Sequence, residues 1–215
     1  MKISSAAFLL VSIGFATAQP QSPFEKWDKE ISSIEQRLKA APPSKGGVFF
    51  VGSSSIRLWK LDKAFPGATN VGFGGSQIRD SAHFASRIIL PYEPSVIVFY
   101  AGDNDIASKR TPNQVLEDFR EFAKKIHDAS PKTRILFLAI KPSVKRWEMH
   151  DQQLSANALV KEFCAKDSRL VYLDTVTIML DSDGKPMPDL FVKDGLHLSD
   201  KGYALWNELV RKHMK

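Results

Sequence analysis

Three neighbouring hydroxyl groups directly follow a short apolar run, in the segment Gly52-Ser53-Ser54-Ser55. A serine at a strand-to-helix turn is accessible to a substrate, and the backbone N–H groups at the start of the helix can stabilise an anion. A serine-rich turn that caps a helix has the same composition. This segment is therefore compatible both with nucleophilic catalysis and with a structural helix cap.

A carboxylate and an imidazole lie close together near the end of the chain, in Asp194-Gly195-Leu196-His197. Residues three apart on a helical turn can lie side by side, so the carboxylate of Asp194 can reach the ring of His197. Such a pair fixes the imidazole tautomer and stabilises the imidazolium that forms when a neighbouring serine loses its proton. The alternative is a polar turn in which Asp194 or Ser199 caps the last helix.

Two glycine-containing segments follow other apolar runs, Gly72-Phe73-Gly74-Gly75 and Gly102-Asp103-Asn104-Asp105. The missing side chains of the first let a ligand approach the backbone closely, whereas the second clusters polar side chains where a buried strand ends. Each segment alone also suits an ordinary turn. All four segments together, each following a successive element of one alternating pattern, occur much less often than any one segment alone.

The elements that must position these residues follow from hydrophobic periodicity. Short apolar runs predict buried strands at 47–52, 70–73, 95–101, 134–140 and 170–173. Helical spacing of apolar residues predicts helices at 24–41, from 111 through 126, at about 147–166 and at about 199–213. Alternating strands and helices predict a three-layer α/β fold with five parallel strands, whose functional residues lie beyond the carboxyl ends of the strands.

Composition excludes several other classes of protein. The chain has 215 residues, of which 43% are hydrophobic and 25% charged, which predicts one compact domain rather than a disordered or fibrous chain. The net charge of +6 is spread along the chain without a basic and aromatic stripe, so no nucleic-acid partner is expected. The only cysteine, Cys164, cannot form an internal disulfide and lies in a pattern typical of the buried side of a helix.

No metal or cofactor is expected. The sequence lacks a His-Glu-x-x-His motif and clustered cysteines, and Asp181-Ser182-Asp183-Gly184 resembles the start of a calcium loop without its later ligands, so we interpret it as a turn. The pattern Gly72-x-Gly74 lacks the third glycine of a dinucleotide-binding fingerprint, because position 77 is a glutamine.

The first 18 residues have the pattern of a secretory signal peptide. Lys2 precedes an apolar run at 6–16, and Ala16-Thr17-Ala18 is a small-x-small cleavage site. We expect cleavage after Ala18 and a secreted or periplasmic protein. The run is shorter than the roughly 20 residues that span a bilayer, so no stable membrane anchor is expected. The expected organisation is then an N-terminal helix and linker at 19–46 and a domain at 47–215.

From about Gly47 to the end of the last helix, these motifs resemble the SGNH hydrolases of the GDSL-like lipase and acylhydrolase group. In that family the nucleophilic serine follows Gly-Asp, and this alignment selects Ser54 rather than Ser53 or Ser55. The chain departs from the family at Ser53, where the family has aspartate. The absence of a Gly-x-Ser-x-Gly elbow, because position 56 is isoleucine, argues against the ordinary α/β-hydrolases.

The resemblance implies roles for the remaining motif residues. It implies a flavodoxin-like SGNH hydrolase fold and a triad of Ser54, His197 and Asp194. The oxyanion hole that it implies consists of the backbone N–H groups of Ser54 and Gly75 and the side-chain amide of Asn104.

The function that the resemblance implies is a secreted serine esterase acting on short-chain or acetyl esters of small molecules, glycans or lipids. The alternative is a noncatalytic binding protein for an acylated glycan or lipid on the same fold, with Ser53 as the sign of lost catalysis. Lys141-Pro142-Ser143 and Trp147 follow the fourth strand and are candidates for the mouth of the site, although Trp147 suits a structural role equally well. The sequence carries no signal for the oligomeric state.

Overall fold

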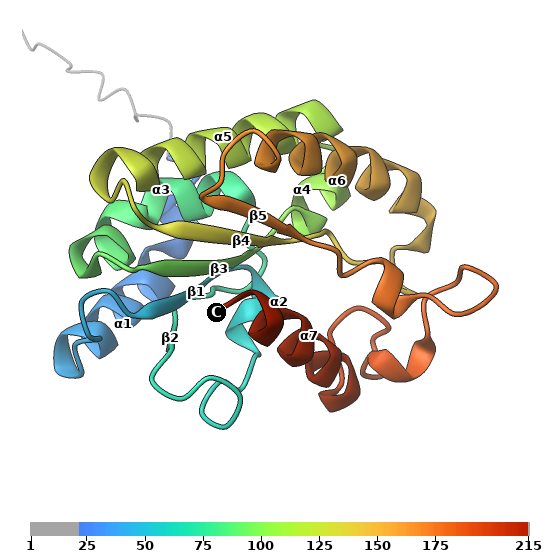
Figure 1. Cartoon of the computed structure of the whole chain (residues 1–215), viewed down its shortest axis with the longest axis horizontal. Coiled ribbons are helices and arrows are strands. Elements are labelled where there is room, and N and C mark those ends of the chain that lie inside the picture. Colours follow the sequence, from blue (N-terminus) through green and yellow to red (C-terminus); the bar gives the residue numbers. More distant parts are fainter. Residues whose placement is uncertain (1–21, 215) are drawn as a thin grey trace, which may run out of the picture.

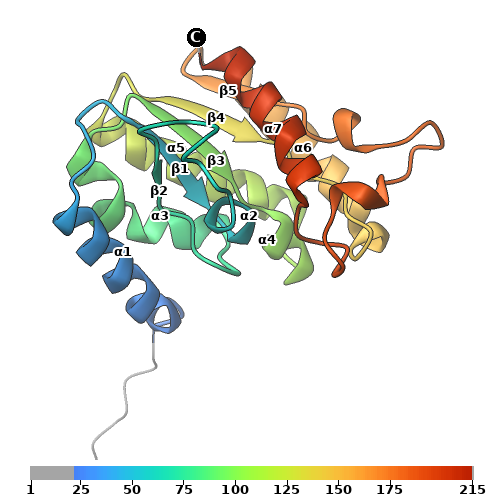
Figure 2. The same ribbon diagram turned by 90° about the horizontal axis from the view of Figure 1, so that it is seen from below.

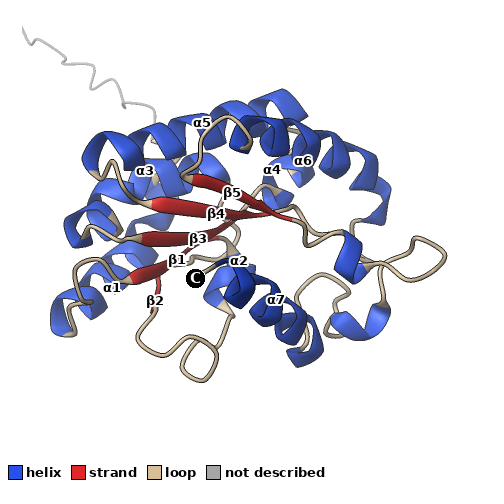
Figure 3. Ribbon diagram, in the orientation of Figure 1, coloured by secondary structure: helices blue, strands red, loops and turns tan. Residues whose placement is uncertain are grey.

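In the computed structural model, which describes residues 22–214, five strands form a parallel sheet. Their order across the sheet is β2-β1-β3-β4-β5 (Figures 1 and 3). The strands are β1 (Val48–Gly52), β2 (Thr69–Asn70), β3 (Val96–Tyr100), β4 (Arg134–Leu138) and β5 (Leu170–Leu173). The predicted three-layer α/β sandwich with five parallel strands is thereby confirmed. The predicted signal peptide and its cleavage site after Ala18 lie outside the described residues.

Helices cover both faces of the sheet. The α-helices are α1 (Asp28–Ala40), α2 (Ser54–Arg57), α3 (Ile78–Ile88), α4 (Asp103–Ala107), α5 (Pro112–Ala129), α6 (His150–Cys164) and α7 (Asp200–His213). Short 3-10 helices are η1 (Glu25–Trp27), η2 (Leu90–Tyr92), η3 (Trp147–Met149), η4 (Thr177–Met179) and η5 (Pro188–Leu190). Figure 2 shows α1 and α7 on opposite sides of the sheet.

Alternate residues of each strand face opposite layers, because side chains of a strand repeat every two residues. Phe49 and Phe99 are buried in one core with apolar residues of α1, α3, α5 and α6. Phe50 and Tyr100 are buried in a second core with residues of α2 and α7. The strands are therefore apolar on both faces, which is why their sequences are unbroken apolar runs.

Two helix starts follow the local signals in the sequence. Thr111 Oγ1 accepts a hydrogen bond of 3.3 Å from Gln114 N at the start of α5. Ser199 Oγ accepts one of 3.3 Å from Gly202 N at the start of α7. Helix α3 is not among the predicted helices, since buried polar residues such as Asp80 and Ser81 interrupt its apolar face.

The predicted strand at 70–73 is shorter in the structure, because β2 ends at Asn70. The chain nevertheless continues along β1, since Val71 N and Phe73 N donate hydrogen bonds of 2.9 and 3.0 Å to the carbonyl oxygens of Phe50 and Gly52. This continuation brings the glycines that follow to the carboxyl end of β1.

The strand order reverses between β1 and β3, where ligands bind in open α/β sheets. Gly52 at the end of β1 lies in register with Tyr100 at the end of β3. Ser54 and Asn104, which follow these two strands, therefore leave the sheet at neighbouring points.

The N-terminal helix α1 buries Ile31, Ile34 and Leu38 in the same core as β1 and β3. The predicted boundary between 19–46 and 47–215 falls between α1 and β1 and stays a prediction. Cys164 is buried in α6, as its pattern predicts, and burial raises the pKa of its thiol to about 12. No helix within residues 22–214 combines the length and apolar character that crossing a membrane requires.

Candidate active site

The structure brings Ser54, His197 and Asp194 into one hydrogen-bonded chain. His197 Nε2 lies 2.9 Å from Ser54 Oγ, although the two residues are 143 positions apart. His197 Nδ1 lies 2.6 Å from Asp194 Oδ2. Ser54 is the first residue of α2, so its hydroxyl emerges where β1 has just ended. Its neighbours Ser53 and Ser55 are both buried.

Asp194 and His197 do not lie on a helical turn, and that expectation is wrong. Helix α7 begins only at Asp200, and Gly195 has a φ of +65°, a left-handed conformation that interrupts helical backbone. The turn is closed instead by the aspartate itself. Asp194 Oδ1 accepts hydrogen bonds of 2.8 Å from Leu196 N and 2.9 Å from His197 N.

These contacts keep the aspartate ionised. Partial burial raises the pKa of Asp194, but the hydrogen bonds from the His197 ring and from the backbone N–H groups of Leu196 and His197 outweigh it and hold the pKa at about 2. A carboxylate at neutral pH can therefore orient the imidazole and stabilise its protonated form.

The remaining predicted residues, Gly75 and Asn104, line the same pocket as Ser54 and His197, which has a volume of about 480 Å³. Gly75 has a φ of +78°, which favours glycine at this position. Within residues 22–214, the N–H groups of Ser54 and Gly75 donate no hydrogen bond and remain available to a bound group. Three donors can thus converge beside the Ser54 hydroxyl.

The side-chain amide of Asn104 is held from both sides. Its Nδ2 donates a hydrogen bond of 3.0 Å to Ser76 O, and its Oδ1 accepts two of 3.2 Å from Arg146. Arg146 also pairs with the buried Asp103 at 2.9 Å and itself lines the pocket. Arg146 is not among the residues predicted from the sequence, because nothing in its local pattern distinguishes it from a surface arginine.

Lys141-Pro142-Ser143 does not line the mouth of the site, so that expectation is wrong. Lys141 is only 1% exposed, with its Nζ 3.7 Å from Asp103 Oδ2, and Ser143 is fully buried. Burial lowers the pKa of Lys141. Trp147 stacks on the ring of His150 with 4.3 Å between the ring centroids. This packing favours the structural role for Trp147 over a place at the mouth of the site.

Two charged residues complete the pocket wall. Glu30 comes from α1 and Arg57 from the end of α2. Glu30 Oε1 accepts a hydrogen bond of 3.2 Å from Gly74 N and lies 3.9 Å from Arg57 Nε. Glu30 is not among the predicted site residues either, because it lies on the polar side of an amphipathic helix, where charged residues are common.

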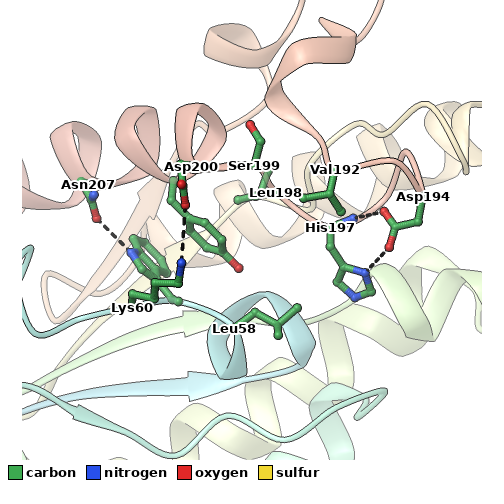
Figure 4. Close-up of a pocket in the computed structure, with 11 residues that line it drawn as sticks. Leu58, Lys60, Val192, Asp194, His197, Leu198, Ser199, Asp200 and Asn207 are labelled. Atoms are coloured by element: carbon green, nitrogen blue, oxygen red, sulfur yellow. Dashed lines mark hydrogen bonds and ion pairs between the residues drawn. The ribbon is translucent and has the colours of Figure 1, made fainter.

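A second cavity of about 690 Å³ runs beside the first, along the start of α7 (Figure 4). It shares only His197 with the pocket that holds Ser54. At its other end, Trp59 Nε1 donates a hydrogen bond of 2.9 Å to Asn207 Oδ1. Ser54 and the predicted oxyanion donors Gly75 and Asn104 therefore belong to the smaller pocket.

The segment that resembles the start of a calcium loop forms a turn. Asp181 Oδ1 accepts hydrogen bonds from Asp183 N at 2.9 Å and Lys185 N at 2.8 Å. In the part of the chain from 22 to 214, no three His, Cys, Asp or Glu side chains gather closely enough to hold a metal ion.

Comparison with known proteins places the chain in a family. The model of the GDSL-like Lipase/Acylhydrolase family matches residues 57–205, which is more than half of the chain. The matched segment contains Gly75, Asn104, Asp194 and His197 and begins just after Ser54. No curated protein matches the chain.

Solved structures share the fold. A Streptococcus pneumonia protein named for platelet activating factor superposes with a TM-score of 0.79 at 20% identity, covering 88% of this chain and 94% of that one. A GDSL-like lipase from Bacteroides thetaiotaomicron gives 0.68 at 19% identity, covering 89% and 96%. A catalytic mutant of an acetylxylan esterase from Geobacillus stearothermophilus gives 0.62 at 13% identity, covering 79% and 94%. With this fold, this pocket and the match of the family model, the chain belongs to the GDSL-like lipase/acylhydrolase family of ester hydrolases.

Proposed function

We propose that this protein is a secreted serine esterase that hydrolyses short-chain acyl esters, including acetyl esters, with Ser54 as the nucleophile. The observation that carries the proposal is the chain of hydrogen bonds from Asp194 through His197 to Ser54, which ends in the pocket lined by Gly75 and Asn104. The signal-peptide pattern of the first 18 residues supports export.

The reaction follows from the positions of these atoms. His197 Nε2 takes the proton of the Ser54 hydroxyl as Oγ attacks the ester carbonyl carbon, and Asp194 stabilises the imidazolium that forms. The imidazolium then gives the proton to the alcohol oxygen as the carbon–oxygen bond breaks. Water attacks the acyl-enzyme by the same route and releases the acid.

The tetrahedral intermediate carries a negative oxygen that the pocket can stabilise. The N–H groups of Ser54 and Gly75 and the second N–H of the Asn104 amide are the donors, each worth roughly 3 to 4 kcal/mol in the transition state. The other N–H of that amide is already bound to Ser76 O, which fixes its direction.

A short acyl group suits the polarity of the pocket. Leu196 is the only residue with an apolar side chain among those that line it, and three of the others are charged, namely Glu30, Arg57 and Arg146. A long acyl chain would remove water from these charges without replacing its hydrogen bonds, which costs several kcal/mol. The structural similarity to an acetylxylan esterase also supports acetyl esters.

The departure at Ser53 does not disturb the turn that presents the nucleophile. The carbonyl oxygen of Ser53 accepts hydrogen bonds of 3.0 Å from Ile56 N and Arg57 N, and its N–H donates to Tyr100 O at 3.0 Å. The backbone therefore holds Ser54 beside His197 without an aspartate at position 53. This geometry supports an enzyme over the noncatalytic binding protein.

The proposal is tested by a fluorophosphonate probe and by hydrolysis of p-nitrophenyl acetate. We expect the probe to label Ser54, and Ser54→Ala to lower kcat at least roughly a thousandfold while the protein stays folded. The matched controls Ser53→Ala and Ser55→Ala should keep most of the activity. A label on Ser53 or Ser55 would refute the assignment, and a folded protein with neither label nor turnover would support the binding protein.

A further inference from the structure

Glu30 and Arg57 lie side by side on the wall of the pocket that holds Ser54. We infer that they form a hydrogen-bonding subsite for hydroxyl groups on the alcohol part of the ester, so that the substrate is an acylated sugar or a similar polyol rather than a lipid. This inference rests on the proposed esterase function and names the substrate class of the same site.

Arg57 presents unused donors to the pocket. It ends the short helix that begins with Ser54, so its position relative to the nucleophile is set by a single helical turn. Its side chain is 48% exposed, and its guanidinium donates no hydrogen bond within residues 22–214. The nearest carboxylate oxygen, Glu30 Oε1, lies at 3.9 Å, beyond hydrogen-bond distance.

A glycine makes room for this arginine. A Cβ atom placed on Gly74 would lie 3.0 Å from Arg57 Nε and 3.2 Å from Arg57 Nη2, both tighter than ordinary contact. The missing side chain at position 74 therefore lets the guanidinium pack against the backbone beside the oxyanion donor Gly75.

Glu30 supplies the acceptors of the subsite. Its Oε1 accepts the hydrogen bond from Gly74 N, whereas its Oε2 has no hydrogen-bond partner in the described part of the chain. The side chain is 37% exposed. Because Ile31 and Ile34 anchor the buried face of α1 in the core, the helix holds Glu30 in place over the pocket.

A polyol fits this pair better than the other alcohols do. Each sugar hydroxyl both donates and accepts, so neighbouring hydroxyls can bind a carboxylate and a guanidinium at once through charge-assisted hydrogen bonds. An aliphatic alcohol would desolvate both charges, and an anionic alcohol would be repelled by Glu30. An acetyl group fills only a small part of the pocket of about 480 Å³, which leaves the remaining space to the alcohol.

The test compares two acetyl esters, methyl mono-O-acetyl-xyloside with two free hydroxyls and p-nitrophenyl acetate with none. We expect Glu30→Gln and Arg57→Gln each to lower kcat/KM for the xyloside at least tenfold more than for p-nitrophenyl acetate, mainly through KM. The control Arg120→Gln should leave this ratio unchanged, since Arg120 is similarly exposed at 45% and pairs with Glu117 on α5.

The substitution Glu30→Gln separates binding from a structural role. The amide oxygen that it introduces can still accept the hydrogen bond from Gly74 N, so the contact that holds the loop is kept. If Glu30 acted only by positioning the loop, any loss of turnover would be equal for both substrates, and this result would overturn the inference. Faster turnover of an acetylated uronic acid in Glu30→Gln, with slower turnover in Arg57→Gln, would also overturn it in favour of an anion site. Absence of turnover of both esters together with no fluorophosphonate label would refute the esterase itself, and the subsite with it.

Discussion

Asn104 illustrates how much of this site depends on the orientation of a single side chain. A cation, Arg146, binds its amide oxygen, and a backbone carbonyl, Ser76 O, binds one of its two N–H groups. An inverted amide would place N–H groups against the guanidinium, so the orientation is determined by its partners. The second N–H donates no hydrogen bond within residues 22–214 and remains available to a bound oxygen.

Because this N–H is proposed to bind charge that exists only in the transition state, Asn104→Ala should lower kcat by roughly 10² to 10³-fold and leave KM nearly unchanged. Steady-state kinetics with p-nitrophenyl acetate measures both constants. A variant altered in KM alone would make Asn104 a residue that contacts the ground-state substrate instead.

At the scale of elements, the close pairing of β1 and β3 determines where Ser54, the proposed nucleophile, leaves the sheet. Gly52 ends β1 with a φ of +136°, and a Cβ atom on it would lie 1.9 Å from Tyr100 O, far inside van der Waals contact. The strand ends can approach this closely only because position 52 carries no side chain.

Gly52→Ala should therefore lower the free energy of unfolding by about 3 kcal/mol or more, since it adds both a clash and backbone strain. Gly184→Ala is the matched control, because Gly184 also has a positive φ, +71°, but a Cβ atom there meets nothing within 4 Å. It should cost only about 1 kcal/mol. Urea denaturation measures both changes, and equal losses would show that the close approach at Gly52 is unimportant.

At the scale of the whole molecule, one buried carboxyl links stability to pH. Asp105 in α4 is fully buried, with Oδ1 accepting a hydrogen bond of 3.2 Å from Ile78 N and Oδ2 without a hydrogen-bond partner among the described residues. Burial raises its pKa from 3.8 to about 7, against the opposing hydrogen bond from Ile78 N. The folded protein therefore holds a proton that the unfolded chain releases above pH 3.8.

This bound proton determines whether the free energy of unfolding rises or falls with pH. Between about pH 4 and pH 7 this carboxyl is ionised in the unfolded chain but protonated in the folded protein. The free energy of unfolding should therefore fall by up to about 1.4 kcal/mol per pH unit over this range and level off above about pH 7. Asp105→Asn should remove this fall, because the amide oxygen still accepts from Ile78 N and carries no charge. Urea unfolding of both proteins across this pH range measures the difference, and a difference that does not vary with pH would contradict a protonated Asp105.

Local signals in the sequence determined the layers of the fold. Strands buried on both faces need continuous apolar runs, and amphipathic helices need apolar residues at helical spacing, so burial is encoded by neighbouring residues. The helix starts at Thr111 and Ser199 are equally local, since one side chain caps the turn that follows it. The order of the motifs, read through the family resemblance, was enough to select Ser54, Asn104 and His197.

Only the tertiary structure decided which side chains meet. Hydrophobic periodicity does not predict that Glu30 reaches the pocket from α1, that Arg146 binds Asn104, or that Lys141 is buried. The same holds for the turn at Gly195, whose left-handed backbone replaces the expected helical turn. Contacts between residues far apart in the chain depend on strand order, register and crossover connections, and these arise from the packing of the whole sheet rather than from any local stretch of sequence.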